Sequence, residues 1–263
     1  MIGGTRVRTL ARQTGVTAGL AEKNYVNSWI LYAIYTSPLA DHLVFKGGTA
    51  LSKLYFPDIW RFSEDLDFTA TDPLPDLRQQ LETALDEISD QSGITFEITN
   101  FYEAGEPIEY VQIDVQYDAV LGQRNTTELD ITFNESLAFP PVQHQHSFED
   151  TPEFGLTAYS IEEILIEKLR NLYQRARARD YYDIYRLLNR ESFDNETVAD
   201  ALREKSRAHN VELDLTNGIP DEDSDDVRLY WDQGLDRLVQ EKPPFDDVLQ
   251  RINDYLIELS RSG

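Results

Sequence analysis

Hydrophobic and polar positions divide the chain into a mixed first part and a helical second part. In the first part, segments with apolar residues three and four apart alternate with short runs in which apolar and polar residues alternate singly. The first spacing is typical of helices and the second of strands. Helices are predicted over residues 5–36, 49–56 and 73–89. Strands are predicted over residues 43–45, 62–68, 95–101, 109–117 and 127–133.

These segments predict an α/β (α+β) domain over residues 1–155. Its last stretch, residues 139–151, holds two adjacent prolines and the histidines His144 and His146. Two histidines spaced in this way are able to bind a transition metal, but the sequence places no further ligand cluster near them. We therefore expect a loop here, with the domain boundary close behind it.

From Ser160 onward the spacing is helical to the end of the chain. Ser160 and Glu163 match the two key positions of a capping box, which predicts the start of a helix. Further helices are predicted over residues 195–209, 227–240 and 245–259, with an acidic turn and linker over 216–226. The pattern predicts a helical C-terminal domain over residues 156–263.

The stretch Val44–Thr69 is the part of the sequence that carries candidate chemistry. Gly47 and Gly48 precede a helical segment, where glycines allow a phosphate to approach the backbone and helix N–H groups favour an anion. Asp65 and Asp67 follow on a predicted strand, and side chains two residues apart on a strand point to one face. Oxygen ligands of this kind suit Mg²⁺, so the stretch indicates a site for a nucleoside triphosphate (NTP).

A third carboxylate from a neighbouring strand would complete a two-metal site. The alternating patterns of the predicted strands offer Asp114 and Asp130. Asp114 lies between two glutamines, which is typical of a solvated face, so we favour Asp130. An ordinary surface role for Asp130 is the alternative interpretation.

Two motifs in this region resemble a known family. They are F-K-G-G-T-A-L-S-K at Phe45–Lys53 and R-F-S-E-D-L-D at Arg61–Asp67. Both are similar to the signature of the AbiEii/AbiGii toxin branch of the nucleotidyltransferase superfamily, although relatives of DNA polymerase β have Gly-Ser in place of Gly-Gly-Thr. The resemblance implies a nucleotidyltransferase fold, with a mixed sheet, flanking helices and a C-terminal helical domain.

The resemblance also implies an activity and partners. The expected reaction moves a nucleoside monophosphate from an NTP to an acceptor hydroxyl with Mg²⁺. The expected acceptor is RNA such as a tRNA end, and the expected role is the toxin of an abortive-infection type toxin–antitoxin pair with a cognate antitoxin. Two other interpretations stay open. One is a non-catalytic protein that binds a partner, and the other is an NTP-dependent enzyme that modifies a protein or small molecule.

Site residues follow from the same motifs and from two later ones. Lys168 matches the lysine of a third motif, and Arg179-Asp180-x-x-Asp183 resembles a fourth. The implied catalytic residues are Asp65, Asp67, Asp130, Lys168, Asp180 and Asp183, of which the first three bind the metal. The implied nucleotide-binding residues are Lys46, Gly47, Gly48, Thr49, Lys53, Ser63 and Lys168. A dense basic run at Arg170, Arg175, Arg177 and Arg179 suggests contact with phosphates of the acceptor, with ion pairs between helices as the alternative.

Charge and composition set the surroundings in which this chemistry works. The 263 residues carry a formal net charge of -24, with 48 acidic against 24 basic side chains. Such a surface repels nucleic acid unless a local basic patch exists, and it is typical of a protein adapted to molar salt in a halophile. The chain has no cysteine and hence no disulfide. With no signal-peptide pattern and no membrane-length apolar run, we expect a cytoplasmic protein without membrane contact.

The net charge leads to a prediction about salt. Self-repulsion destabilises the compact state, and molar salt shortens the Debye length to ~3 Å. We therefore expect the midpoint of thermal unfolding to rise strongly between millimolar and molar KCl, measured by circular dichroism. A midpoint that stays constant over this range would contradict the halophilic interpretation and make the acidic surface a candidate binding site.

Overall fold

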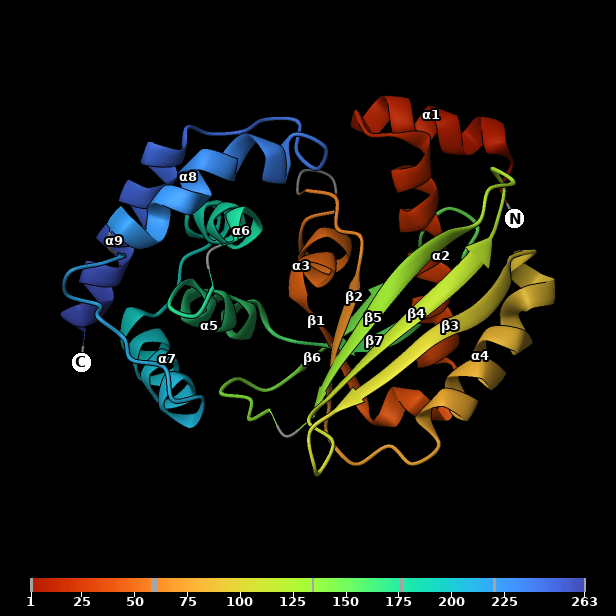
Figure 1. The fold of residues 1–263 in the computed structure, drawn as a ribbon, viewed down its shortest axis with the longest axis horizontal. Coiled ribbons are helices and arrows are strands. Elements are labelled where there is room, and N and C mark those ends of the chain that lie inside the picture. The colour runs from red at the N-terminus through yellow and green to blue at the C-terminus, as the bar shows by residue number, and fades with distance from the viewer. Residues whose placement is uncertain (1, 58–60, 134, 176, 220, 263) are drawn as a thin grey trace. The chain divides into compact units, whose positions relative to one another are not determined.

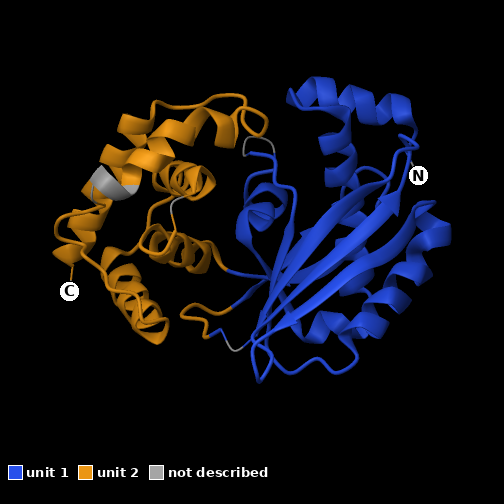
Figure 2. Ribbon diagram, in the orientation of Figure 1, with its two compact units in different colours: residues 1–135, 141–159 blue, residues 136–140, 160–263 orange. Residues whose placement is uncertain are grey.

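The computed structural model of the chain describes residues 2–57, 61–133, 135–175, 177–219 and 221–262. It divides into two compact units, coloured separately in Figure 2. Unit 1 comprises residues 1–135 and 141–159, and unit 2 comprises residues 136–140 and 160–263. The chain therefore passes from one unit to the other at three places.

Unit 1 begins with helices and continues with strands (Figure 1). Its helical elements are α1 (Gly4–Thr14), α2 (Ala18–Tyr35), a 3₁₀ turn (Pro38–Asp41), α3 (Gly47–Ala50) with a π-helical continuation (Leu51–Tyr55), and α4 (Leu77–Ser92). Its strands are β1 (Leu43–Lys46), β2 (Leu66–Ala70), β3 (Thr95–Ala104), β4 (Tyr110–Asp118), β5 (Asn125–Phe133), β6 (Val142–His146) and β7 (Phe154–Ala158).

Within the described residues, the strands form one seven-stranded sheet in the order β3-β4-β5-β2-β1-β7-β6. Strand β2 runs antiparallel to β1 and parallel to β5, and β1 runs parallel to β7. The sheet is thus mixed, which confirms the predicted fold class. The short strands β1 and β2 lie at its centre.

The two faces of the sheet differ in chemistry because side chains alternate along each strand. One face carries Phe45, Phe68, Ile131 and Val111 from four neighbouring strands, each at most 1% exposed. Helices α2 and α4 lie on this side, where α2 contacts β5 and β7 and α4 contacts β3 (Figure 1). The opposite face of the central strands is polar.

The predicted secondary structure was wrong in several places, and strand β7 was not predicted at all. The stretch expected as a loop contains the edge strand β6 with both histidines, and a largely exposed strand gives little hydrophobic alternation to read. Strand β2 begins at Leu66 rather than at Phe62. Helix α8 occupies Asp221–Leu235, so it begins inside the stretch expected as an acidic linker.

The late start of β2 has a physical reason. The Glu64 carbonyl accepts hydrogen bonds from Asn27 Nδ2 at 3.0 Å and from Thr127 Oγ1 at 3.0 Å. The Asp65 carbonyl accepts one from Thr49 Oγ1 at 2.5 Å. Side chains therefore bind these two carbonyls in place of the backbone of a neighbouring strand.

Unit 2 is helical, with α5 (Ile161–Leu172), α6 (Ala178–Leu188), α7 (Asn195–Ala208), α8 and α9 (Phe245–Ser260). The predicted cap at the start of α5 is confirmed, because Ser160 Oγ accepts a hydrogen bond from the Glu163 N–H at 3.2 Å. No helix in the described part of the chain has the length and hydropathy needed to cross a membrane.

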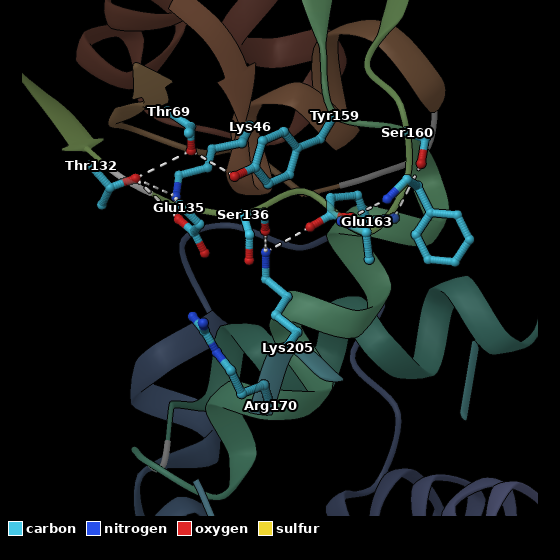
Figure 3. Close-up of polar contacts among 12 residues, drawn as sticks. Lys46, Thr69, Thr132, Glu135, Ser136, Tyr159, Ser160, Glu163, Arg170 and Lys205 are labelled. Carbon is cyan, nitrogen blue, oxygen red and sulfur yellow. Dashed lines mark hydrogen bonds and ion pairs between the residues drawn. The ribbon is translucent and has the colours of Figure 1, made fainter. Parts of the chain in front are cut away.

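A buried ion pair holds the segment 136–140 within unit 2 (Figure 3). The Glu163 carboxylate accepts a hydrogen bond from Lys205 Nζ at 2.6 Å, and from the N–H groups of Ala138 and Phe139 at 2.9 Å each. Lys205 Nζ also donates to the Ser136 carbonyl at 3.1 Å. Both charges are nearly fully buried, so the pair is costly to break by removing one partner.

Candidate active site

A row of functional side chains crosses the polar face of the sheet. The backbone register pairs Lys46 of β1 with Asp67 of β2, and Asp67 with Asp130 of β5. Gln112 of β4 is the next partner of Asp130. Neighbouring strands lie about 4.8 Å apart and paired residues face the same side, so the two aspartates stand next to each other.

Asp65 lies two residues before Asp67, directly before β2 begins. The Thr49 hydroxyl donates a hydrogen bond to the backbone carbonyl of Asp65 and holds it in place. Across from it on β5 is Glu128, whose pKa is raised by burial and then by the charges of Asp130 and Asp65. Several carboxylates thus lie close enough to repel one another, and a bound cation would relieve that repulsion.

Gly47 and Gly48 leave room for charged side chains. Gly47 has φ +78°, a left-handed conformation that favours glycine, and a Cβ on it would lie 2.2 Å from Asp67 Oδ2. A Cβ on Gly48 would lie 2.2 Å from Arg61 Nη2. The Asp67 carboxylate therefore packs directly on the glycine turn, a reason for the two glycines that the sequence did not reveal.

The third carboxylate has a defined partner. The Tyr110 hydroxyl at the start of β4 donates a hydrogen bond to Asp130 Oδ1. Burial, followed by this bond and the charge of Asp130, raises the pKa of Tyr110, so the phenol stays protonated and able to donate.

The strand register favours Asp130 over Asp114 as the partner of Asp67. Asp130 is the direct neighbour of Asp67 on the adjacent strand β5. Asp114 lies on β4, one strand further away, where it pairs with Glu128. A metal bound by Asp67 is therefore within closer reach of Asp130.

Lys46 lies in the same row, and its ammonium is bound by side chains at and after the end of β5. Lys46 Nζ donates to Glu135 Oε2 at 2.8 Å and to Thr132 Oγ1 at 2.9 Å (Figure 3). Next to them the Thr69 and Tyr159 hydroxyls are 2.6 Å apart. Lys46 and Glu135 are both largely buried, so this pair is part of the framework beside the aspartates.

Two predicted nucleotide-binding side chains are turned into the interior of unit 1, contrary to expectation. Lys53 Nζ donates to Ser28 Oγ at 2.7 Å and to the Asn24 carbonyl at 2.9 Å, both on α2. The hydroxyl of Thr49, which is fully buried, is bound to the Asp65 carbonyl. Both residues lie on the helical segment after the glycines. Their side chains are on the side of that segment that packs against α2 and β2. Ser63 is buried as well.

Lys53 and the nearby His146 affect each other's charge. Burial lowers the pKa of Lys53 to about 7. Burial and then the Lys53 charge lower the pKa of His146 to about 3. His146 Nε2 lies 3.3 Å from Ser28 Oγ, so the lysine, serine and histidine form one internal network.

The predicted residues of unit 2 form a cluster of their own. Lys168 Nζ lies 2.9 Å from Asp180 Oδ1 and 2.9 Å from Asp183 Oδ2, and all three residues are buried. Arg175, which is exposed, approaches Asp180 Oδ2 at 3.8 Å. In the basic run, Arg170 is buried, Arg177 is exposed and Arg179 is half-buried. The Lys168 ammonium, on the apolar side of α5, thus faces the carboxylates of Asp180 and Asp183.

The donor chemistry suits a hard divalent cation that arrives with its substrate. Across the residues that the structure describes, no group of three or more His, Cys, Asp or Glu side chains is arranged to hold a metal ion. Mg²⁺ is usually bound through one or two carboxylates together with substrate phosphates and water. Asp67 and Asp130 fit that requirement, with Asp65 beside them.

Solved structures with a similar fold include a nucleotidyltransferase toxin. MenT4, the nucleotidyltransferase toxin Rv2826c from Mycobacterium tuberculosis H37Rv, matches with a TM-score of 0.71 and 18% identity, over 99% of this chain and 90% of its own. JHP933 from Helicobacter pylori matches with a TM-score of 0.61 and 18% identity, over 94% of each chain. At this identity the likeness shows the fold. No curated protein matches the sequence.

The fold and the family together define a nucleotidyltransferase. The family model described as "Nucleotidyl transferase AbiEii toxin, Type IV TA system" matches residues 29–251. The chain therefore belongs to the AbiEii nucleotidyltransferase toxins of type IV toxin–antitoxin systems. Membership confirms the resemblance carried by the two motifs, and it implies an NTP substrate and an antitoxin partner.

Sequence reasoning missed three residues of the site. Tyr110, Glu128 and Glu135 contact or face the predicted residues, and none lies in a recognisable motif. Glu128 precedes Asp130 by two positions, so strand alternation was a signal that could have found it. Tyr110 could be found only from the register of β4, and Glu135 only from the path of the chain after β5.

The contact between Gly47 and Asp67 is testable with a matched glycine. Gly122 is also left-handed, at φ +67°, but has open space where a Cβ would lie. Gly122→Ala is expected to cost roughly 1–2 kcal/mol of unfolding free energy from backbone strain alone, and to keep activity. Gly47→Ala should cost more and abolish nucleotide transfer, because the Asp67 carboxylate must move. Urea unfolding and NTP incorporation measure the two effects, and equal costs with full activity would contradict the contact.

The interior position of Lys53 predicts a dependence of stability on pH. Because its pKa is about 7 in the folded protein and near 10.5 when unfolded, the unfolded state holds the extra proton between these values. Stability should therefore rise with pH from about 7 toward 10, by up to ~1.4 kcal/mol per pH unit. In Lys53→Met this rise should disappear while NTP use persists. Urea unfolding at pH 7 and 9 checks the first part, and a large increase in KM for NTP would return Lys53 to the nucleotide-binding set.

Proposed function

We propose that the protein transfers a nucleoside monophosphate from an NTP to a hydroxyl of an RNA acceptor, such as a tRNA end, and releases pyrophosphate. The single observation that carries this proposal is the register pairing of Asp67 with Asp130 on parallel central strands, beside Asp65. The proposal adds Mg²⁺ and the RNA acceptor to the established class of enzyme.

Asp65, Asp67 and Asp130 are the residues that would hold Mg²⁺. When bound, the metal would supply charge stabilisation at the attacking and leaving oxygens of the displacement. Asp130, at the edge of this set toward β4, is the proposed acceptor of the proton from the attacking hydroxyl. The pairing of β5 with β2 puts Asp130 next to Asp67 on the same face of the sheet.

The phosphates of the NTP require cations besides the metal. We propose the backbone of Gly47 and Gly48 as the phosphate-binding turn and Lys168 as the lysine that binds the triphosphate. The contacts from Asp180 and Asp183 support a role for these two carboxylates in orienting Lys168. The exposed Arg175 and Arg177 are the proposed contacts for the acceptor backbone, since the rest of the chain is strongly acidic.

The test uses purified protein with Mg²⁺, each labelled NTP in turn and total RNA. Label is expected in an RNA fraction with the wild-type protein, and chelation of divalent metal should abolish it. Asp65→Ala and Asp67→Ala are expected to reduce incorporation by roughly a hundredfold or more, with folding intact by circular dichroism.

Asp130→Asn and Asp114→Asn form a matched pair on neighbouring strands. The first should lose incorporation like Asp67→Ala, while the second should stay within about twofold of wild type because Asp114 lies a strand further from Asp67. A reversed result would assign the third carboxylate to Asp114. Label found on protein or a small molecule, with none on RNA, would overturn the acceptor.

A further inference from the structure

Strand β4 supplies a hydrogen-bond donor to Asp130 of β5. Its residues on the polar face are Tyr110 and Gln112 at the end of the sheet that holds the aspartates. The Tyr110 hydroxyl donates a hydrogen bond to Asp130 Oδ1. The acid of β5 that stands beside Asp67 is thus bound from the neighbouring strand.

The contact between Tyr110 and Asp130 is diagonal. In the register, Tyr110 is opposite Thr132, and Asp130 is opposite Gln112. A long aromatic side chain reaches a diagonal neighbour across an antiparallel pair, where a short one would not. Tyr110 is half-buried on a regular strand, so its ring has a fixed origin from which to direct the hydroxyl.

An unsupported aspartate rotates about two side-chain bonds, and a carboxylate has two oxygens that are equivalent ligands. A hydrogen-bond donor that binds one carboxylate oxygen selects one orientation of the carboxylate. The second oxygen then points in a fixed direction. Groups that hold a metal ligand in this way generally matter for affinity nearly as much as the ligands themselves. The effect is largest where few protein ligands are available, as with the pair Asp67 and Asp130.

We propose that Tyr110 is a positioning residue, whose hydroxyl fixes the Asp130 carboxylate in the orientation that receives a divalent cation brought by the triphosphate. The inference rests on the proposed function, in which Asp130 and Asp67 hold the metal together. Tyr110 touches neither metal nor substrate and acts through Asp130.

The test measures metal binding without turnover. Mn²⁺ bound in the presence of an NTP analogue with a non-hydrolysable α,β bond is counted by electron paramagnetic resonance, in the salt that keeps the protein folded. Tyr110→Phe removes only the hydroxyl and is expected to weaken Mn²⁺ binding about tenfold. The Mg²⁺ concentration for half-maximal rate should rise in parallel, with the KM for NTP at saturating Mg²⁺ nearly unchanged. Tyr102→Phe, at a tyrosine 55% exposed on β3, is the matched control and should bind Mn²⁺ like wild type.

A double-variant cycle separates positioning from a general loss of structure. In the Asp130→Asn background, adding Tyr110→Phe should cause no further loss of Mn²⁺ binding, because the group it positions is already gone. Wild-type affinity in Tyr110→Phe, or an equal loss in both backgrounds, would overturn the proposal. A wild-type protein that binds no Mn²⁺ with the analogue and incorporates no nucleotide would instead overturn the proposed function, and the inference with it.

Discussion

The register of β2 between β1 and β5 is the constraint on which the site depends. Because side chains alternate along a strand, a slip by one residue would carry Asp67 to the apolar face and bring Phe68 to the polar one. The buried row that contains Phe45, Phe68 and Ile131 resists that slip, since each ring or branched chain would lose its packing. Hydrophobic burial on one side of the sheet thereby holds two like charges together on the other.

Holding those charges together has an electrostatic cost, which the hydrogen bond from the Tyr110 hydroxyl to Asp130 offsets in part. The lysine in the same row, Lys46, is engaged by Glu135 and Thr132. Burial, and then the charges of Asp130 and Asp65, raise the pKa of Glu128 beside them. Unit 1 therefore presents a negative face to a substrate that is itself strongly negative. In the proposed reaction, such a site would favour phosphate groups that come with divalent metal over those that come without it.

Much of this architecture was readable from the sequence, and the exceptions have identifiable causes. Strands β4 and β5 and the helices of unit 2 were predicted because each buries one regular face. Strand β3 was predicted from the alternation of its residues, although most of them are exposed. Strand β6 was missed because its residues lie at an exposed edge, where backbone pairing with β7 supplies the stability. The motifs led to Asp65 and Asp67 as candidates, and strand alternation led to Asp130. The motifs also led to Lys53 and Thr49, whose side chains are turned into the interior of unit 1. The sequence does not show which side of the short helical segment after the glycines is buried, because that depends on what packs against it.

The exchange of the segment 136–140 between the units has a consequence for how the protein is made. The sheet of unit 1 is incomplete until β7 has been synthesised and can pair with β1. The N–H groups of Ala138 and Phe139 bind Glu163, and that carboxylate in turn needs Lys205 far downstream. Both units are assembled from two pieces of chain, but they are completed at different points of synthesis. Unit 1, with the row of Lys46, Asp67 and Asp130, is complete at residue 159, whereas the segment 136–140 gains its buried ion pair only when Lys205 has been made. A chain interrupted between these two points would contain every strand of the sheet and leave that segment without the charge that binds Glu163.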